Sequence, residues 1–289
     1  MTEFGLLVKA LRKSSMDEYG KRWTRESLSK AIHLTPNQLG RLERGDRKHL
    51  DNQTLELLAK AFKLTNLEQK EFFIAASGLK DEVLFQNEIP EYQLKNLISL
   101  MESLQVPAFA LDAYGDIIAA NTSAINFFCV TEELIGYALT IPAGLNHIRF
   151  MYSSKYGFKD IVGPCWREAA IIEMYLFRRS TLRYRHTDYF NYLFKALLKE
   201  KDFDIDWYAS QRNPSFKNLT YEAFNYDHSR YGPISYTATE TIVNTREGDL
   251  YLIMYNSTDK LTTKVFYSLN GPGKNHVKKL ASWPEKEIL

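Results

Sequence analysis

The residue types that most often catalyse reactions or bind metals are few in this 289-residue sequence and are poorly spaced for either task. Its six histidines show no HxxxH or HExxH spacing, the ligand pattern of zinc enzymes. Cys129 and Cys165 form no CxxC pair, so we interpret both as packed thiols of a reducing compartment. There is no GxSxG motif and no phosphate-binding loop, and residues 227–229 (Asp-His-Ser) form only a chance triplet. The sequence therefore predicts no enzyme, no catalytic residue and no bound metal.

Charge is distributed unevenly along the chain, although 37 basic and 35 acidic residues leave a net charge of only +2. The first fifty residues hold eleven basic and six acidic side chains, a net charge of +5, so the remaining 239 residues carry −3. A basic amino-terminal part suits an anionic partner. We therefore expect two parts with different partners.

Short amphipathic helices are expected throughout the basic part, because apolar residues recur there at every third or fourth position. One helix has especially clear ends. Thr35 is its N-cap, Pro36 stands at the first helical position, Gln38 completes a capping box, and Gly45 ends it. The other four helices are expected at residues 4–13, 24–32, 52–62 and 66–76.

The second and third of these helices, separated by a few residues, resemble the helix-turn-helix of the XRE/Cro type. The stretch that carries the resemblance is TRESLSKAIHLTPNQLGRLERGDRKHLDNQTLELLAKAFKL, including the LERG end of the third helix. The resemblance extends from Phe4 to Leu79. It implies an all-α DNA-binding domain with double-stranded DNA as its partner, bound as a homodimer on two half-sites.

By this resemblance, residues 35–43 form the helix that enters the major groove with its amino-terminal residues at base edges. Asn37 and Gln38 are predicted to read bases, because a side-chain amide can pair bidentately with adenine. Glu43 fits a structural carboxylate that holds a nearby arginine. For each single residue the alternative is a solvated helix face. Arg25 is the next candidate, for a base or a phosphate. The residues expected near phosphates are Thr35, Arg41, Arg44 and Arg47.

A different pattern begins after Pro107. Residues 108–112 and 117–121 are expected to form a hairpin around Gly115, and Asn121 can cap the helix that follows. This strand-turn-strand-helix order resembles the opening of a PAS fold, in which a sheet and short helices enclose a cavity. Further strands are expected at 235–243 and 248–255, and longer helices near 94–104, 166–184 and 188–201.

The whole arrangement resembles the MmyB-type transcription regulators, in which an XRE helix-turn-helix precedes a PAS-like ligand-binding domain. The resemblance rests on Pro107–Asp112 with the hairpin, on LNHIRF at 145–150, on WREA at 166–169, and on the aromatic helical region up to Trp207. It covers roughly residues 1–257. The His-Pro stretch usual in the family is replaced here by YGP at 231–233.

The family resemblance implies that the second domain binds a fatty acid or similar lipid as effector ligand, with no other cofactor. A chain of ~14–18 carbons would gain ~0.8 kcal/mol per buried CH₂. Its carboxylate would need a cation or a cluster of donors. Arg167 and Arg178 are the first candidate cations, Arg149 and the other basic residues of 178–186 are further ones, and tyrosine hydroxyls could share the task. Each arginine could instead form a surface ion pair. The apolar candidates, each of which could instead be plain core, are Phe109, Leu111, Ile118, Phe128, Phe150, Trp166, Met174, Trp207, Leu252 and Met254.

These interpretations predict an α+β chain. It has a helix-turn-helix domain at 1–79, a linker and helix at 80–104, a PAS-like antiparallel sheet domain at 105–258 and an unassigned tail at 259–289. We expect no membrane span and a cytoplasmic protein, because there is no run of ~18 apolar residues and no signal-peptide pattern. The predicted function is a sequence-specific transcription regulator that senses a fatty acid or similar apolar molecule. Alternatives are a second domain used only for dimerisation or protein contacts, and an enzyme with a DNA-binding appendage.

Overall fold

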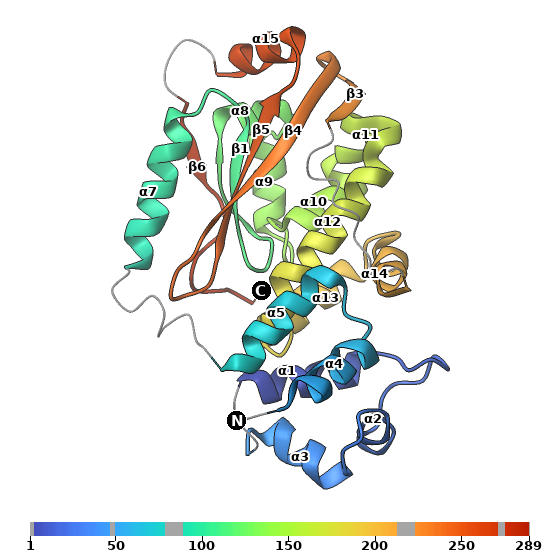
Figure 1. Ribbon diagram of the computed structural model, residues 1–289. Helices are drawn as coiled ribbons and strands as arrows, with labels where there is room; N and C mark the ends of the chain where they lie inside the picture. Colours follow the sequence, from blue (N-terminus) through green and yellow to red (C-terminus); the bar gives the residue numbers. More distant parts are fainter. Residues whose placement is uncertain (1–2, 47–49, 79–88, 213–222, 271–274, 289) are drawn as a thin grey trace.

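The computed structural model describes residues 3–46, 50–78, 89–212, 223–270 and 275–288. Its amino-terminal part consists of helices whose apolar faces form one core around Leu7, Leu28, Leu39 and Phe72. These helices occupy the lower part of Figure 1. The five predicted helices are confirmed, as α1 (Glu3–Ser14), α2 (Arg25–Ala31), α3 (Pro36–Arg44), α4 (Asn52–Ala61) and α5 (Asn66–Ser77).

The predicted caps determine where α2 and α3 begin. The backbone N–H of Gln38 donates to the Thr35 hydroxyl at 3.2 Å, and the backbone N–H of Thr35 donates to the side-chain oxygen of Gln38 at 2.8 Å. Thr24 forms the same reciprocal pair with Ser27 at the start of α2. Gly45 ends α3 with φ of +81°, in the left-handed region that favours glycine. Local sequence alone therefore sets both ends of α3.

The second part of the chain is built on a six-stranded sheet with the order β3-β4-β5-β1-β2-β6, in which every pairing is antiparallel. The predicted hairpin is present as β1 (Ala108–Asp112) and β2 (Ile117–Asn121). The two predicted later strands are β4 (Gly232–Val243) and β5 (Leu250–Ser257), and β5 lies between β4 and β1. The sequence did not predict β3 (Phe224–His228), which pairs with β4. The α+β fold class is confirmed.

The sheet domain continues past residue 258, where the sequence placed the start of the tail. Helix α15 (Lys260–Leu269) packs against β4 and β5, and β6 (Val277–Lys279) pairs with β2. Farther on, Lys286 forms ion pairs with the buried Asp112 and Asp116. These contacts make residues 259–288, apart from the undescribed 271–274, part of the same folded unit.

Helices cover both faces of the sheet. Helix α7 (Pro90–Ser103) packs on one face against β1, β2 and β6 (Figure 1). A large aromatic core lies on the other face, among the helices α8 (Thr122–Phe127), α9 (Glu132–Leu139), α10 (His147–Tyr152), α11 (Phe158–Val162), α12 (Trp166–Thr181), α13 (Asp188–Leu197) and α14 (Phe203–Arg212). Three 3₁₀ turns connect them, η1 (Ser154–Tyr156), η2 (Gly163–Cys165) and η3 (Leu182–Tyr184). Across the described ranges, no helix has the length and apolar character needed to cross a membrane.

Candidate functional site

The first candidate site is the exposed amino-terminal end of α3. Thr35, Asn37 and Gln38 are exposed there, while Leu39 and Leu42 on the opposite side of the helix are buried in the core. The side-chain oxygen of Gln38 already accepts a hydrogen bond from the backbone N–H of Thr35. A bidentate base contact from Gln38 would therefore require this oxygen to accept a second hydrogen bond. Asn37 plays no part in the capping box and is the simpler candidate for reading a base.

Glu43 holds this end of the domain together from inside. Its carboxylate is 1% exposed and accepts hydrogen bonds from Arg12 Nε at 2.5 Å and Arg25 Nε at 2.8 Å. Burial acts to raise the pKa of Glu43, but the hydrogen bonds and charges of the two arginines outweigh burial and hold this pKa below its ordinary value. The interpretation of Glu43 as a structural carboxylate is confirmed. Arg25 is thereby positioned at the start of α2 with 47% of its side chain exposed.

The remaining basic residues predicted to contact DNA lie on or after α3. Arg41 and Arg44 are exposed, and Arg44 Nε lies 3.0 Å from Asp46 in an ion pair whose partners are both about half exposed. Such an exposed ion pair contributes little to stability, so Arg44 can exchange Asp46 for a phosphate at low cost. Arg47 lies outside the described residues.

We expect Arg44→Ala to weaken binding to all DNA sequences by a similar factor and to reduce the salt dependence by about one counterion, because a phosphate contact carries no sequence information. Fluorescence anisotropy over a salt series would measure both effects, using a duplex selected from a random library and a scrambled duplex. Arg246→Ala is the matched control, because Arg246 is an exposed, ion-paired arginine of the sheet domain. A change in sequence preference in the Arg44 variant would contradict the phosphate role.

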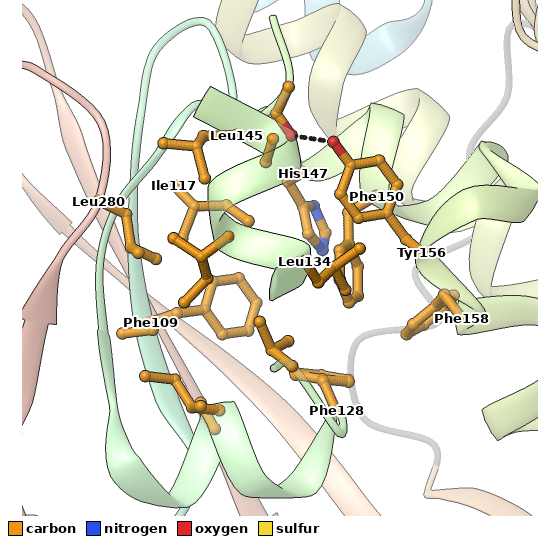
Figure 2. A pocket seen from close by; sticks show the side chains of 17 residues that line it. Phe109, Ile117, Phe128, Leu134, Leu145, His147, Phe150, Tyr156, Phe158 and Leu280 are labelled. Carbon is orange, nitrogen blue, oxygen red and sulfur yellow. Dashed lines mark hydrogen bonds between the residues drawn. The ribbon is translucent and has the colours of Figure 1, made fainter. Parts of the chain in front are cut away.

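The second candidate site is an apolar pocket between the β1–β2 hairpin and helices α8 to α11 (Figure 2). Phe109, Phe128 and Phe150 line it, as the sequence analysis proposed, and the Phe128 ring contacts each of the other two edge to face at centroid distances near 6 Å. Among the described residues of its wall, only His147 and Tyr156 have polar side-chain atoms. The Tyr156 hydroxyl donates to the Gly144 carbonyl (Figure 2). The pocket is therefore suited to an apolar ligand with at most a small polar group.

Several predicted ligand residues lie elsewhere, and strand geometry explains three of them. Successive side chains of a strand point to opposite faces of the sheet. Ile118, Leu252 and Met254 belong to the face that α7 covers, whereas Phe109 and Ile117 face the pocket. Sequence alternation indicated two faces but not which face enclosed the pocket. Of the other apolar candidates, Leu111 lines a separate cavity beside α12. Trp166, Met174 and Trp207 pack in the aromatic core instead of lining the pocket.

Neither predicted head-group cation lines the pocket. Arg167 donates to both carboxylate oxygens of Asp206, at 2.5 and 2.7 Å. Arg178 is completely buried and pairs with Glu68 at 2.8 Å. Both arginines thus have carboxylate partners away from the pocket, so the structure does not bring them to a ligand head group there.

Sequence reasoning missed part of the pocket wall. Leu134, Ile135 and Ala138 come from α9, and Leu280 follows β6. The apolar spacing of α9 after its N-cap Thr131 was a usable signal. Leu280 gave no local signal, because it reaches the pocket only through the pairing of β6 with β2.

A third feature joins the two parts of the chain. Glu68 of α5 is fully buried and binds three donors, namely Arg178, Arg185 and, at 2.7 Å, the Thr65 amide. The guanidinium carbons of the two arginines lie 4.4 and 4.9 Å from the ring centroid of Trp207. Burial acts to raise the pKa of Glu68, but the two arginine charges outweigh burial and lower this pKa. We call these four side chains, Glu68, Arg178, Arg185 and Trp207, the interdomain cluster.

Helix α12 connects the interdomain cluster to the pocket. Glu173, in the first half of α12, lies 3.5 Å from His147 Nδ1 on the pocket wall. Arg178 follows on the same helix, and Leu182 in η3 is buried in the core of the amino-terminal helices. In Figure 1, α12 runs from beside the sheet towards α5, which it contacts.

An exposed helix-turn-helix joined to a sheet domain with an apolar pocket defines the class of DNA-binding regulators that carry a ligand-binding domain. Residues 20–68 match the helix-turn-helix family, and residues 95–269 match the MmyB-like transcription regulator ligand binding domain. The second match spans more than half of the chain, so the chain belongs to the MmyB-like transcription regulators. No curated protein matches it. Both predicted resemblances are confirmed, and both matched families are regulator domains rather than catalytic ones.

Proposed function

We propose that this regulator binds double-stranded DNA as a homodimer, and that a long-chain fatty acid or similar lipid in the apolar pocket controls its DNA binding. The observation that carries the proposal is the pocket wall, which is apolar except for His147 and Tyr156. Ligand pockets are mostly apolar with a few polar groups that fix orientation. Dimerisation follows from the half-site geometry of helix-turn-helix domains.

The ligand needs more room than the pocket now offers. Its cavity volume is about 60 Å³, whereas pockets for small molecules commonly measure about 300–1,000 Å³. Helix α9 is the part of the wall that can yield most easily. It buries only Ile135 and Ala138, and its other side, including Tyr137 and Leu139, faces solvent. We therefore expect α9 to move outward when an acyl chain binds.

The route from pocket to DNA runs through α12. A ligand that moves His147 also acts on Glu173, and α12 ends in the interdomain cluster. A ligand controls DNA binding only to the extent that it binds two arrangements of the protein with different affinities. The firm docking of α5 on α12 supplies a contact through which such arrangements can differ.

Native mass spectrometry of the full-length protein tests the ligand directly. After mild preparation we expect an added mass of a lipid that denaturing conditions remove. Phe128→Trp should abolish it by filling the pocket, because a larger side chain cannot be accommodated without displacing neighbours. Tyr267→Trp, at an exposed position of α15 outside the pocket wall, is the matched control and should keep the lipid. A bare protein mass, with no thermal shift upon addition of either fatty acids or fatty alcohols, would favour a domain that serves only dimerisation or protein contacts.

A further inference from the structure

We propose that the ligand of this pocket ends in an uncharged hydrogen-bonding group, such as a hydroxyl or a carboxamide, which is bound at His147 and at the Glu173 carboxyl behind it. The inference rests on the proposed function and narrows it, because of the ligands named there it favours a lipid with an uncharged end over an ionised fatty acid. The sequence predicted an arginine that binds a carboxylate head group, whereas this inference assigns the head group to an uncharged site.

His147 is the polar side chain on which the inference begins. It is 8% exposed and lines both the apolar pocket and a second cavity, which we call the polar chamber. The other polar side chain of the pocket, Tyr156, has its proton engaged by the Gly144 carbonyl. A polar group at the end of an apolar ligand therefore finds its donor or acceptor chiefly at His147.

The polar chamber lies between α10, α12 and strands β3 to β5. Glu173, Tyr226, Tyr236 and Tyr255 border it, together with His147. Its volume is about 30 Å³, enough for roughly one or two water molecules or a group of that size. The three tyrosines add hydroxyl groups to the histidine and the carboxyl group, so the chamber has hydrogen-bonding capacity to offer.

The charges around His147 argue against a carboxylate. Burial raises the pKa of Glu173 to about 8, with a contribution from Glu240, and burial lowers the pKa of His147 to about 4. At neutral pH both groups are therefore mainly uncharged, and each can donate and accept. The Arg179 guanidinium borders a cavity together with His147 and Glu173 and acts to lower the pKa of Glu173, but it already donates to both oxygens of Glu240 at 2.7 and 2.8 Å.

The remaining arginines close to this region also have partners. Arg149 pairs with Glu200, and Arg167 pairs with Asp206. A carboxylate placed against His147 would therefore lose its hydration without gaining a cation, and would approach a second carboxyl group. A hydroxyl or carboxamide avoids both penalties and matches groups that donate and accept.

Four twelve-carbon ligands that differ only in their head group test the inference. Dodecanol, dodecanamide, dodecanoate and dodecylamine would be titrated into the full-length protein at pH 7, with affinities from calorimetry or native mass spectrometry. We expect the alcohol and the amide to bind at least about tenfold more tightly than the carboxylate, because only the carboxylate must be desolvated as an ion. This ranking uses the unaltered protein and does not depend on any variant folding.

Two variants locate the preference. His147→Phe keeps an aromatic ring of similar shape but removes its hydrogen-bonding atoms, so the advantage of the alcohol should fall to less than about twofold. Glu173→Gln keeps an uncharged donor and acceptor and should retain alcohol binding. His276→Phe, at an exposed histidine of the same domain, is the matched control and should leave the ranking unchanged.

Each contrary result has a distinct meaning. Tightest binding of dodecanoate, or equal binding of all four, would overturn the inference while leaving a lipid pocket in place. Tightest binding of dodecylamine that is lost in Glu173→Gln would also overturn it, because the site would then recognise cations. Failure of all four ligands to bind would overturn the proposed function, and this inference with it.

Discussion

Replacing Arg178 with methionine is expected to lower the free energy of unfolding by about 3–5 kcal/mol, the range found when one partner of a buried ion pair is removed. The Glu68 carboxylate would stay fully buried with Arg185 and the Thr65 amide as its remaining described partners. Methionine fills most of the volume of the arginine side chain, so the decrease in the free energy of unfolding reflects the missing charge and not a cavity. The contact of Arg178 with the Trp207 ring would disappear as well.

Denaturant unfolding followed by circular dichroism and tryptophan fluorescence would measure this effect. Arg246→Met is the matched control, because Arg246 and Glu247 are both more than 40% exposed and such pairs contribute at most about 1 kcal/mol. Replacing all three charged members together, Arg178→Met, Arg185→Met and Glu68→Leu, should recover part of the loss, since apolar side chains then replace the whole ionic group and no buried charge is left unpaired. A single variant as stable as the unaltered protein would show that the interdomain cluster does not hold the two parts together.

The ionic character of the interdomain cluster has a consequence for docking. The Nε atoms of Arg178 and Arg185 are buried without a hydrogen-bond partner among the described residues, so the cluster is not fully satisfied. An apolar contact of the same area would avoid that cost but would tolerate sliding of α5 along α12. Hydrogen bonds to one carboxylate fix a direction. We infer that the cluster favours one orientation of the helix-turn-helix relative to the sheet domain.

The elements that could be predicted from the sequence are those with local causes. Thr35, Pro36, Gln38 and Gly45 lie within eleven residues of one another and specify both ends of α3 without any distant partner. The β1–β2 hairpin is equally local, because its turn at Gly115 requires a positive φ of +78°. Local hydrogen bonds and backbone preferences act in the same way wherever the segment lies.

The parts of the candidate sites that could not be predicted depend on distant partners. Arg178 looked available for a ligand, yet Glu68, 110 positions earlier, occupies it. The pairing of β6 with β2 brings Leu280 to the pocket from beyond an undescribed segment. The face on which Ile118 and Leu252 lie was decided by where α7 packs. None of these outcomes leaves a trace in the spacing of nearby residues.

Replacing Asn37 and Gln38 together with alanine is expected to reduce the preference for a selected operator over a scrambled duplex by at least about 30-fold, since each bidentate base contact contributes about 1–3 kcal/mol of discrimination. Both side chains are exposed at the start of α3, where a helix in the major groove presents its base-reading residues. Binding to the scrambled duplex should change little, because it depends mainly on phosphate contacts.

Anisotropy titrations on the two duplexes at one salt concentration would measure the preference. Gln38 also completes the capping box, so its loss could loosen α3 instead of removing a base contact. Gln38→Glu separates these roles, because glutamate keeps the cap but cannot donate to adenine. Asn37→Ala leaves the cap intact and isolates a single contact. If the double variant discriminates as well as the unaltered protein while Gln38→Glu and Asn37→Ala also have no effect, base reading must reside elsewhere than at this end of α3.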